Sequence, residues 1–132
     1  MTVNSIILST GSYLPERILT NADLEKMVDT TDEWITQRSG IKERHIAADN
    51  ETTGDMAINA ARKALKNSSL SSDDIDGVIV ATTTPDRTFP SVAVKVQGEL
   101  NLKPGLAFDV QAVCTGFVYA LTVADNLSLI HI

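Results

Sequence analysis

Three short, continuous runs of apolar residues constrain the fold of this chain more than any other feature of its sequence. The runs cover residues 6–8, 77–82 and 106–110, and segments with helical spacing lie between and after them. A continuous apolar run of this length is typical of a strand buried on both faces, as in parallel sheets that helices cover. The order β, α, β, α, β, α therefore predicts an α/β layered fold with a largely parallel sheet.

Helix-start signals predict where the helices begin, because a hydroxyl or amide side chain at the N-cap accepts a hydrogen bond from the first turn. The signals place helix starts at Thr20 or Asn21 for a helix that runs to residue 28, at Thr30, at Thr52 or Thr53, and at Pro90. The second start is a capping box with Glu33 three residues on, and Gly40 is expected to end that helix. The last helix, after residue 116, is apolar nearly all round and is therefore expected to be enclosed on all sides.

The only cysteine of the sequence stands where the apolar run 106–110 turns abruptly into this last helix. At such a position the Cys114 thiol faces unpaired backbone N–H groups and the positive end of the helix dipole, and both favour the thiolate. The flanking Ala112 and Gly116 are small enough for a substrate carbonyl to approach the backbone. These residues indicate a nucleophile. The alternative is a buried cysteine that only fills space, and these ten residues leave both interpretations open.

Trp34 and Arg38 are four residues apart in a predicted helix, so they share one face. A tryptophan beside an arginine can clamp a flat, negatively charged ligand by stacking and by charge-assisted hydrogen bonds. The alternative is a tryptophan packed on the domain with the arginine stem lying over it. Helical spacing alone does not separate the two interpretations.

Composition and charge exclude several classes of protein. The 132 residues predict one domain, and 43% hydrophobic with 21% charged residues is ordinary globular material. The net charge of −6, without a cluster of Lys or Arg, argues against nucleic acids and anionic membranes as partners. No basic segment leads into the first apolar run, which argues against a signal peptide, and no apolar stretch approaches membrane-spanning length.

The cysteine and histidine content favours a cytoplasmic protein without a metal site. One cysteine cannot form an internal disulfide, which fits a reducing compartment. Two histidines far apart in the sequence and one cysteine give no spacing typical of metal ligands.

Several motifs, taken in order, resemble the β-ketoacyl-acyl-carrier-protein synthase III family. They are residues 11–16 (Gly-Ser-Tyr-Leu-Pro-Glu), 20–25 (Thr-Asn-Ala-Asp-Leu-Glu), 32–35 (Asp-Glu-Trp-Ile), 38–41 (Arg-Ser-Gly-Ile), 89–91 (Phe-Pro-Ser), 108–110 (Phe-Asp-Val) and 114–117 (Cys-Thr-Gly-Phe). Any one of these motifs alone is weak, whereas their succession is specific. The resemblance extends from about residue 6 to residue 126.

The resemblance implies the N-terminal half of a thiolase-like fold and an acyltransferase that primes fatty acid synthesis. In that family an acyl group passes from acetyl-CoA to a cysteine and then condenses, with decarboxylation, with malonyl-carrier protein. By position Cys114 is the nucleophile, and its backbone N–H is part of an oxyanion hole. Thr30, Trp34 and Arg38 are implied to bind coenzyme A, and Phe89 to line the substrate pocket across a dimer interface. Coenzyme A thioester is a substrate here, and no permanently bound cofactor is implied.

The family's catalytic His and Asn find no counterpart in this sequence. His45 follows Arg44 in a predicted, exposed surface turn, and His131 lies in a tail, residues 127–132, that does not resemble the family. We therefore expect residues 1–126 to be the N-terminal half of a condensing-enzyme domain, truncated after that point and inactive in condensation. The implied partners are short acyl-CoA, an acyl carrier protein that docks outside this segment, and a second copy of the full-length protein.

Three alternatives remain at this point. A starter-unit ketosynthase of polyketide or quinolone type would share these motifs. A non-catalytic remnant that binds coenzyme A or dimerises would explain the missing His and Asn. A chain without stable structure would follow if the apolar last helix stays uncovered, because large exposed apolar patches drive association.

Overall fold

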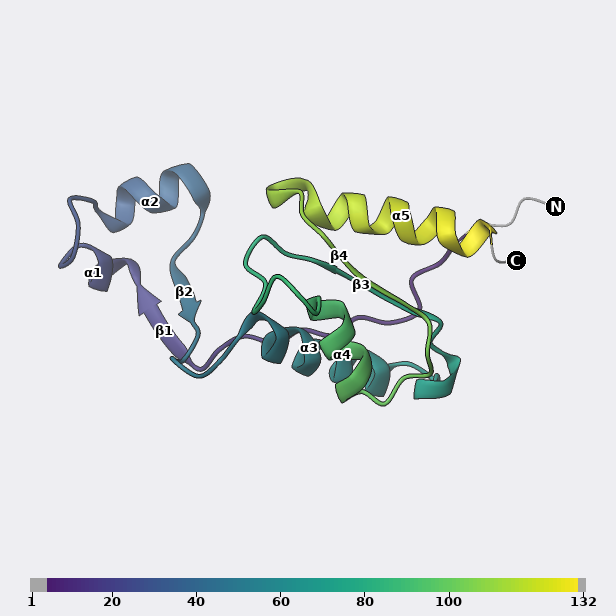
Figure 1. Ribbon diagram of the computed structural model, residues 1–132. Helices are drawn as coiled ribbons and strands as arrows, with labels where there is room; N and C mark the ends of the chain where they lie inside the picture. Colours follow the sequence, from purple (N-terminus) through teal and green to yellow (C-terminus); the bar gives the residue numbers. More distant parts are fainter. Residues whose placement is uncertain (1–4, 131–132) are drawn as a thin grey trace. The chain divides into compact units, whose positions relative to one another are not determined.

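A computed structural model describes residues 5–130, which form two compact units (Figure 1). The large unit comprises residues 5–13 and 52–130, and the small unit comprises Leu14–Glu51. The small unit holds β1 (Arg17–Thr20), α1 (Asn21–Leu24), α2 (Asp32–Ser39) and β2 (Glu43–Ile46), and the large unit holds α3 (Thr53–Asn67), the 3₁₀ helix η1 (Ser72–Asp74), β3 (Gly77–Ala81), α4 (Val92–Glu99), β4 (Leu106–Val110), the 3₁₀ helix η2 (Val113–Thr115) and α5 (Gly116–Ile130). No helix within residues 5–130 is both long and apolar enough to cross a membrane.

The large unit has three layers. Strands β3 and β4 pair in parallel, with Gly77 opposite Leu106 and Ala81 opposite Val110. Helices α3 and α4 lie on one face of this pair and α5 lies on the other (Figure 1). Both strands were predicted from their apolar runs, and the layered α/β arrangement with a parallel pair is confirmed.

The core of the large unit lies between the sheet and the helices α3 and α4. Its most deeply buried apolar side chains are Ile58 from α3 and Val92, Ala93 and Val96 from α4. Partly buried residues of β3 pack against these side chains from the sheet, so the core is covered on both sides. Burial on one helix face is what the spacing of apolar residues along α3 predicts.

The N-cap of α3 is Thr52, one of the two starts that the sequence predicts, and the structure adds a capping box there. The Thr52 hydroxyl accepts the backbone N–H of Asp55, and the Asp55 carboxylate accepts the backbone N–H of Thr52 at 2.9 Å. The helix ends at Asn67 with Ser68 as the C-cap.

The small unit is organised around a buried asparagine. Asn21 is 2% exposed and donates from Nδ2 to Asp32 Oδ1 at 2.7 Å and to the carbonyl of Ile41 at 2.8 Å. Its Oδ1 accepts a hydrogen bond from Arg44 at 2.8 Å. One side chain thereby joins α1, α2 and β2, while β1 and β2 pair antiparallel.

Residues 6–8 were predicted to form a strand buried on both faces, and this is wrong for the described chain. Ile6, Ile7 and Leu8 are 76%, 72% and 63% exposed, and both described sheets are two-stranded without them. The segment runs instead beside α3, where the Ser9 hydroxyl donates to the carbonyl of Ala64 at 2.8 Å. Without a neighbouring strand, an extended apolar segment has neither a ladder partner nor a cover.

The expectation that the last helix is enclosed on all sides is also wrong for the described chain. Phe117, Val118 and Tyr119 are more than half exposed on α5. The helix packs on β3 and β4 along one side only, so the described residues leave its other faces open.

Three predicted helix boundaries differ from the structure. In one case the helix is shorter than predicted, and in two a neighbouring residue is the N-cap. Helix α1 ends at Leu24, although Thr20 caps it as predicted. Thr31, and not Thr30, accepts the first-turn N–H of α2, and Gly40 ends this helix at a φ of 70°. Helix α4 begins at Val92 and not at Pro90, because the Ser91 hydroxyl is its N-cap and accepts the backbone N–H of Val94.

The predicted domain boundary at residue 126 falls inside α5, which continues to Ile130. The structure of residues 5–130 does not mark a domain end at residue 126, so this boundary stays a prediction. His131, which the sequence places in the atypical tail, lies outside the described residues.

Candidate functional site

Cys114 sits in a tight turn between β4 and α5. The turn is the 3₁₀ helix η2, closed by the backbone N–H of Thr115, which donates to the carbonyl of Ala112 at 3.1 Å. The Thr115 hydroxyl donates to the same carbonyl at 2.8 Å. The thiol is free and its side chain is exposed, so Cys114 does not fill space in a core of the described chain. The predicted strand-to-helix turn is therefore present, with its thiol open to a reactant.

Val113, immediately before the cysteine, has a φ of 47°, in the left-handed region. A β-branched residue there is a genuine outlier that costs about 1–3 kcal/mol, and such strain clusters at functional sites. Packing holds the turn in this shape: Gly116 is buried, and a Cβ atom on it would approach the Cβ of Ala81 at 3.2 Å. No local sequence pattern predicts this conformation of Val113.

Phe89 lies in the loop between β3 and α4 and is 86% exposed. This loop, residues 82–91, carries an exposed aromatic ring, but hydrogen bonds fix its backbone. The Thr53 hydroxyl donates to the carbonyl of Thr84 at 2.6 Å, and the backbone N–H of Gly54 donates to Asp86 at 2.8 Å. The loop is thus fastened to the first turn of α3.

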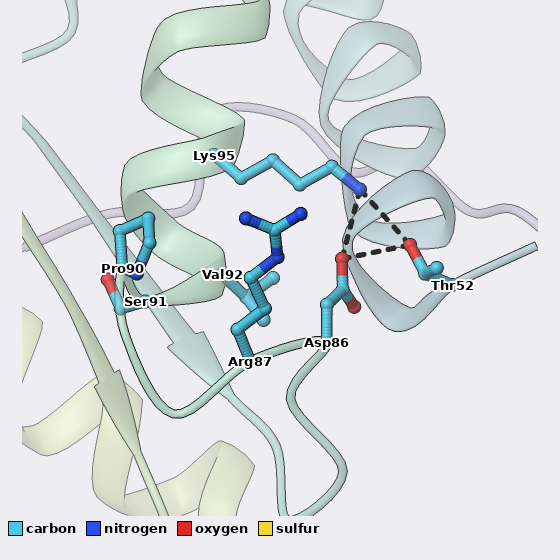
Figure 2. Close-up of a pocket in the computed structure, with 7 residues that line it drawn as sticks. All are labelled: Thr52, Asp86, Arg87, Pro90, Ser91, Val92 and Lys95. Carbon is cyan, nitrogen blue, oxygen red and sulfur yellow. Dashed lines mark hydrogen bonds and ion pairs between the residues drawn. The ribbon is translucent and has the colours of Figure 1, made fainter.

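A polar and charged cluster of Thr52, Asp55, Asp86 and Lys95 also holds this loop. Figure 2 shows three of its members, Thr52, Asp86 and Lys95. Lys95 Nζ on α4 lies 2.9 Å from both Asp55 Oδ1 and Asp86 Oδ2. Together with Arg87 and the residues that start α4, part of the cluster lines a pocket of about 510 Å³. The sequence analysis missed the cluster, because only the fold brings α3, the loop and α4 together.

The cluster shifts the protonation of its members in the expected directions. Hydrogen bonds from Thr52 and Lys95 hold the pKa of Asp55 well below its usual value. Burial opposes the ionised form of Asp86, but the bonds from Gly54, Lys95 and Thr52 together lower its pKa. The two carboxylates in turn raise the pKa of Lys95.

An acid titration tests this cluster. Because the pKa of Asp86 is lower in the folded than in the unfolded chain, its ionised form stabilises the fold above pH of about 4, and this contribution disappears as pH falls through the lowered value. We expect Asp86→Asn to lower the free energy of unfolding at pH 7 by about 1–3 kcal/mol and to reduce its fall on acidification. Asp125→Asn, an exposed carboxylate on α5, is the control and should leave both unchanged. Equal acid sensitivity of wild type and Asp86→Asn, measured by thermal melting, would contradict the assignment.

Trp34 and Arg38 lie together on α2 as the sequence predicts. The Arg38 guanidinium carbon is 4.4 Å from the centroid of the Trp34 ring, and Trp34 is 53% exposed. A flat ligand held between the two needs about 7 Å, twice a van der Waals separation, so Arg38 must swing away to admit one. Both side chains are exposed, so little opposes this movement. Thr30, half-buried, precedes the N-cap of the same helix.

The five predicted site residues fall into two groups. Thr30, Trp34 and Arg38 belong to the small unit, whereas Phe89 and Cys114 belong to the large unit. Each group is placed by its own unit.

His45 was predicted to be an exposed residue in a surface turn, and this is wrong. It lies in β2, opposite Ile18 of β1, and is half-buried. Its ring nitrogen Nδ1 contacts the carbonyl oxygen of Pro15. Strand pairing withdraws His45 from solvent. No three His, Cys, Asp or Glu side chains among residues 5–130 lie close enough together to hold a metal ion.

Comparison with known proteins finds no matching family model but many similar sequences. The chain is 60% identical over 126 residues to Beta-ketoacyl-[acyl-carrier-protein] synthase III of Paramagnetospirillum magneticum, which covers 96% of the chain and 39% of that protein. It is 65% identical over 123 residues to the enzyme of the same name from Thiobacillus denitrificans, covering 92% of the chain and 39% of that protein. The chain thus spans about two fifths of the length of these curated relatives.

Solved structures give the same result for the fold. The crystal structure of 3-oxoacyl-[acyl-carrier-protein] synthase III from Aquifex aeolicus matches with a TM-score of 0.86 and 54% identity, over 91% of this chain and 39% of that one. The priming beta-ketosynthase of the R1128 polyketide pathway matches with a TM-score of 0.85 and 37% identity, over 91% and 36%. The predicted thiolase-like layered fold is confirmed for the matched residues.

Proposed function

We propose that this chain, which is homologous to part of β-ketoacyl-[acyl-carrier-protein] synthase III, carries the acyl-accepting cysteine of an enzyme that primes fatty acid synthesis. The observation that carries the proposal is the exposed Cys114 thiol in a strained turn that leads directly into α5. A thiol at that place has unpaired first-turn N–H groups beside it, which can donate to the negative charge that develops when the sulfur attacks a carbonyl.

In the proposed first step the Cys114 thiolate attacks the carbonyl carbon of an acyl-CoA thioester. A new bond forms between Sγ and the carbonyl carbon, the bond to the coenzyme A sulfur breaks, and the departing thiolate takes a proton from solvent. N–H groups of a first helical turn have no acceptor within the helix, so the Cys114 N–H can donate to the developing oxyanion. Decarboxylative condensation with a malonyl group on the carrier protein would follow.

The direct test is acyl transfer from acetyl-CoA to Cys114, measured by peptide mass spectrometry after incubation with the full-length protein that contains this chain. We expect one acetyl group, on the peptide of Cys114, which hydroxylamine removes as it does other thioesters. Acetylation elsewhere, or none, would reject the proposal. The 132-residue chain alone is expected to form no ketoacyl product, since it lacks the His and Asn that condensation requires in the family.

The small unit is proposed to bind the adenine end of coenzyme A through Thr30, Trp34 and Arg38. Trp34 offers a half-exposed ring for stacking, and Arg38 offers a mobile cation for a phosphate. The proposed partners are accordingly a short acyl-CoA, an acyl carrier protein and a second copy of the full-length chain, in the cytoplasm. Phe89 is proposed to line the acyl pocket.

Replacing Trp34 with alanine tests the coenzyme A site. Loss of one base-stacking contact costs about 1–3 kcal/mol, so we expect Kd for acetyl-CoA to rise roughly tenfold in equilibrium titration. The matched control is Met27→Ala, which removes another exposed apolar side chain from the same unit. Equal Kd values for wild type and Trp34→Ala would remove the tryptophan from the site.

A starter-unit ketosynthase of a polyketide pathway is the second candidate. It is favoured by the likeness to the R1128 priming beta-ketosynthase. Comparing acetyl-CoA with longer acyl-CoA thioesters as donors to Cys114 tests the two candidates, and we expect acetyl-CoA to be the preferred donor if the chain primes fatty acid synthesis from acetyl-CoA.

A further inference from the structure

The buried side chain of Asn21 holds helix α2 at both of its ends. Its Nδ2 donates at 2.7 Å to the carboxylate of Asp32, the first residue of α2. The same nitrogen donates at 2.8 Å to the carbonyl oxygen of Ile41, which follows the C-cap Gly40. The Arg44 guanidinium donates to Asn21 Oδ1 at 2.8 Å, and this bond fixes which side of the amide faces α2.

These polar contacts matter because α2 has little apolar packing of its own. None of its eight residues is buried in the described chain, and only Ile35 and Thr36 are half-buried. Burial of an apolar face is what fixes most surface helices on their domain, and α2 lacks such a face. Its orientation therefore depends on a few hydrogen bonds. Besides those of Asn21, the Glu25 carboxylate accepts the backbone N–H of Asp32 at 2.6 Å.

The anchored face of α2 lies opposite the face that carries Trp34 and Arg38. Successive helix residues are about 100° apart, so Asp32 and Thr36 share one face and Trp34 lies about 200° round the helix from Asp32. Thr36 strengthens the anchored face, since its hydroxyl donates to the Asp32 carboxylate at 3.3 Å. Trp34 and Arg38 are turned away from that face and are exposed. Asn21 therefore acts on the two side chains through the orientation of the helix.

A fixed α2 backbone matters for a ligand that enters between Trp34 and Arg38. The Arg38 guanidinium carbon is 4.4 Å from the centroid of the Trp34 ring, so Arg38 has to move while the ring stays in place for stacking. If α2 itself swings, the ring faces the ligand in only a fraction of the molecules. The apparent Kd then rises by the inverse of that fraction.

We infer that Asn21 is a positioning residue that fixes α2 and thereby sets how tightly Trp34 and Arg38 hold a planar, anionic ligand, the adenine nucleotide of coenzyme A. The ligand in this inference rests on the proposed function, whereas the anchoring of α2 does not.

The experiment uses the full-length protein that contains this chain, labelled with fluorotryptophan. Asn21→Asp keeps the side-chain shape but places a carboxylate oxygen where Nδ2 donates, so both bonds to α2 are lost. Asp32→Ala breaks one of these bonds from the exposed side of α2, where a substitution leaves the fold intact. Thr20→Ala is the control, because it removes the N-cap of α1 and leaves the Asn21 side chain in place.

Three quantities are measured for each variant. The first is the fluorine resonance of Trp34 without ligand, assigned by its absence in Trp34→Phe. The second is Kd for coenzyme A in equilibrium titration. The third is the rate of Cys114 acylation at saturating acetyl-CoA, which separates weaker binding from slower chemistry.

In Asn21→Asp the Trp34 resonance should shift or broaden and Kd should rise about tenfold, with an intermediate rise in Asp32→Ala. The acylation rate at saturation should stay within about twofold of wild type, because Cys114 belongs to the other unit and only binding is weakened. Thr20→Ala should keep the wild-type resonance and Kd. If Asn21→Asp does not fold, Asp32→Ala decides by the same measurements.

An unchanged Trp34 resonance or an unchanged Kd in the Asn21 and Asp32 variants overturns the positioning role, as does an equal rise of Kd in Thr20→Ala. A wild-type protein that binds no coenzyme A, while its Trp34 resonance responds to Asn21→Asp, rejects the proposed coenzyme A site and leaves the anchoring of α2 established.

Discussion

Cys114→Ala will abolish acyl transfer from acetyl-CoA, by at least about 10³-fold, without disturbing the fold. The loss is large because no other side chain can form the thioester, and nucleophile removal in covalent catalysis costs this much or more. The fold should persist because the thiol is exposed and makes no contact in a core of the described residues. Acetyl incorporation and thermal melting measure the two quantities.

Cys114→Ser is the matched variant, since it retains shape and hydrogen bonding but offers a far weaker nucleophile. We also expect iodoacetamide to modify Cys114 of the wild type near neutral pH faster than a model thiol, with acetyl-CoA protecting it. Acetyl transfer that survives in Cys114→Ala, or alkylation at the rate of a model thiol without protection, would show that this cysteine is not the nucleophile.

Gly11→Ala will destabilise the large unit by about 2–3 kcal/mol, as overpacking does where backbone cannot retreat. A Cβ atom on Gly11 would overlap the backbone nitrogen of Ala64 and the carbonyl oxygen of Ala60 on α3. Both are helix backbone, so relief requires moving the N-terminal segment away from α3. That movement breaks the bond from the Ser9 hydroxyl to the carbonyl of Ala64.

Gly98→Ala is the control of opposite sign. Gly98 lies in α4, where an added Cβ meets nothing within 4 Å. Alanine lowers the entropy of the unfolded chain and favours the helix, so stability should rise by about 0.5–1 kcal/mol. Chemical denaturation of both variants gives the comparison, and a neutral Gly11→Ala would mean that the N-terminal segment does not lie on α3 in solution.

Local signals predicted those elements whose causes lie within a few residues. The helix start at Thr52, the glycine that ends α2 at Gly40 and the apolar runs of β3 and β4 each have a local physical origin, and each is confirmed. At α2 the sequence offered two neighbouring hydroxyls, and the structure uses Thr31 and not Thr30 as the N-cap.

Burial could not be predicted from the apolar character of a segment. Residues 6–8 and α5 are as apolar as buried elements, yet the described chain leaves them largely exposed, because burial requires a partner surface that no local pattern supplies. The same limit hid the charged cluster around Lys95, whose members come from α3, the Phe89 loop and α4.

The properties of Cys114, the most distinctive residue of the sequence, fall into the same two groups. Its neighbours alone determined that a cysteine would stand at a strand-to-helix turn, since the apolar run and the small residues around it are local. Only the tertiary structure decided that the thiol is exposed and that Val113 is strained. The physical reason is the sequence separation over which each effect acts. Helix propensity and capping act between near neighbours in the sequence, whereas exposure, backbone strain and anchoring depend on contacts with distant segments.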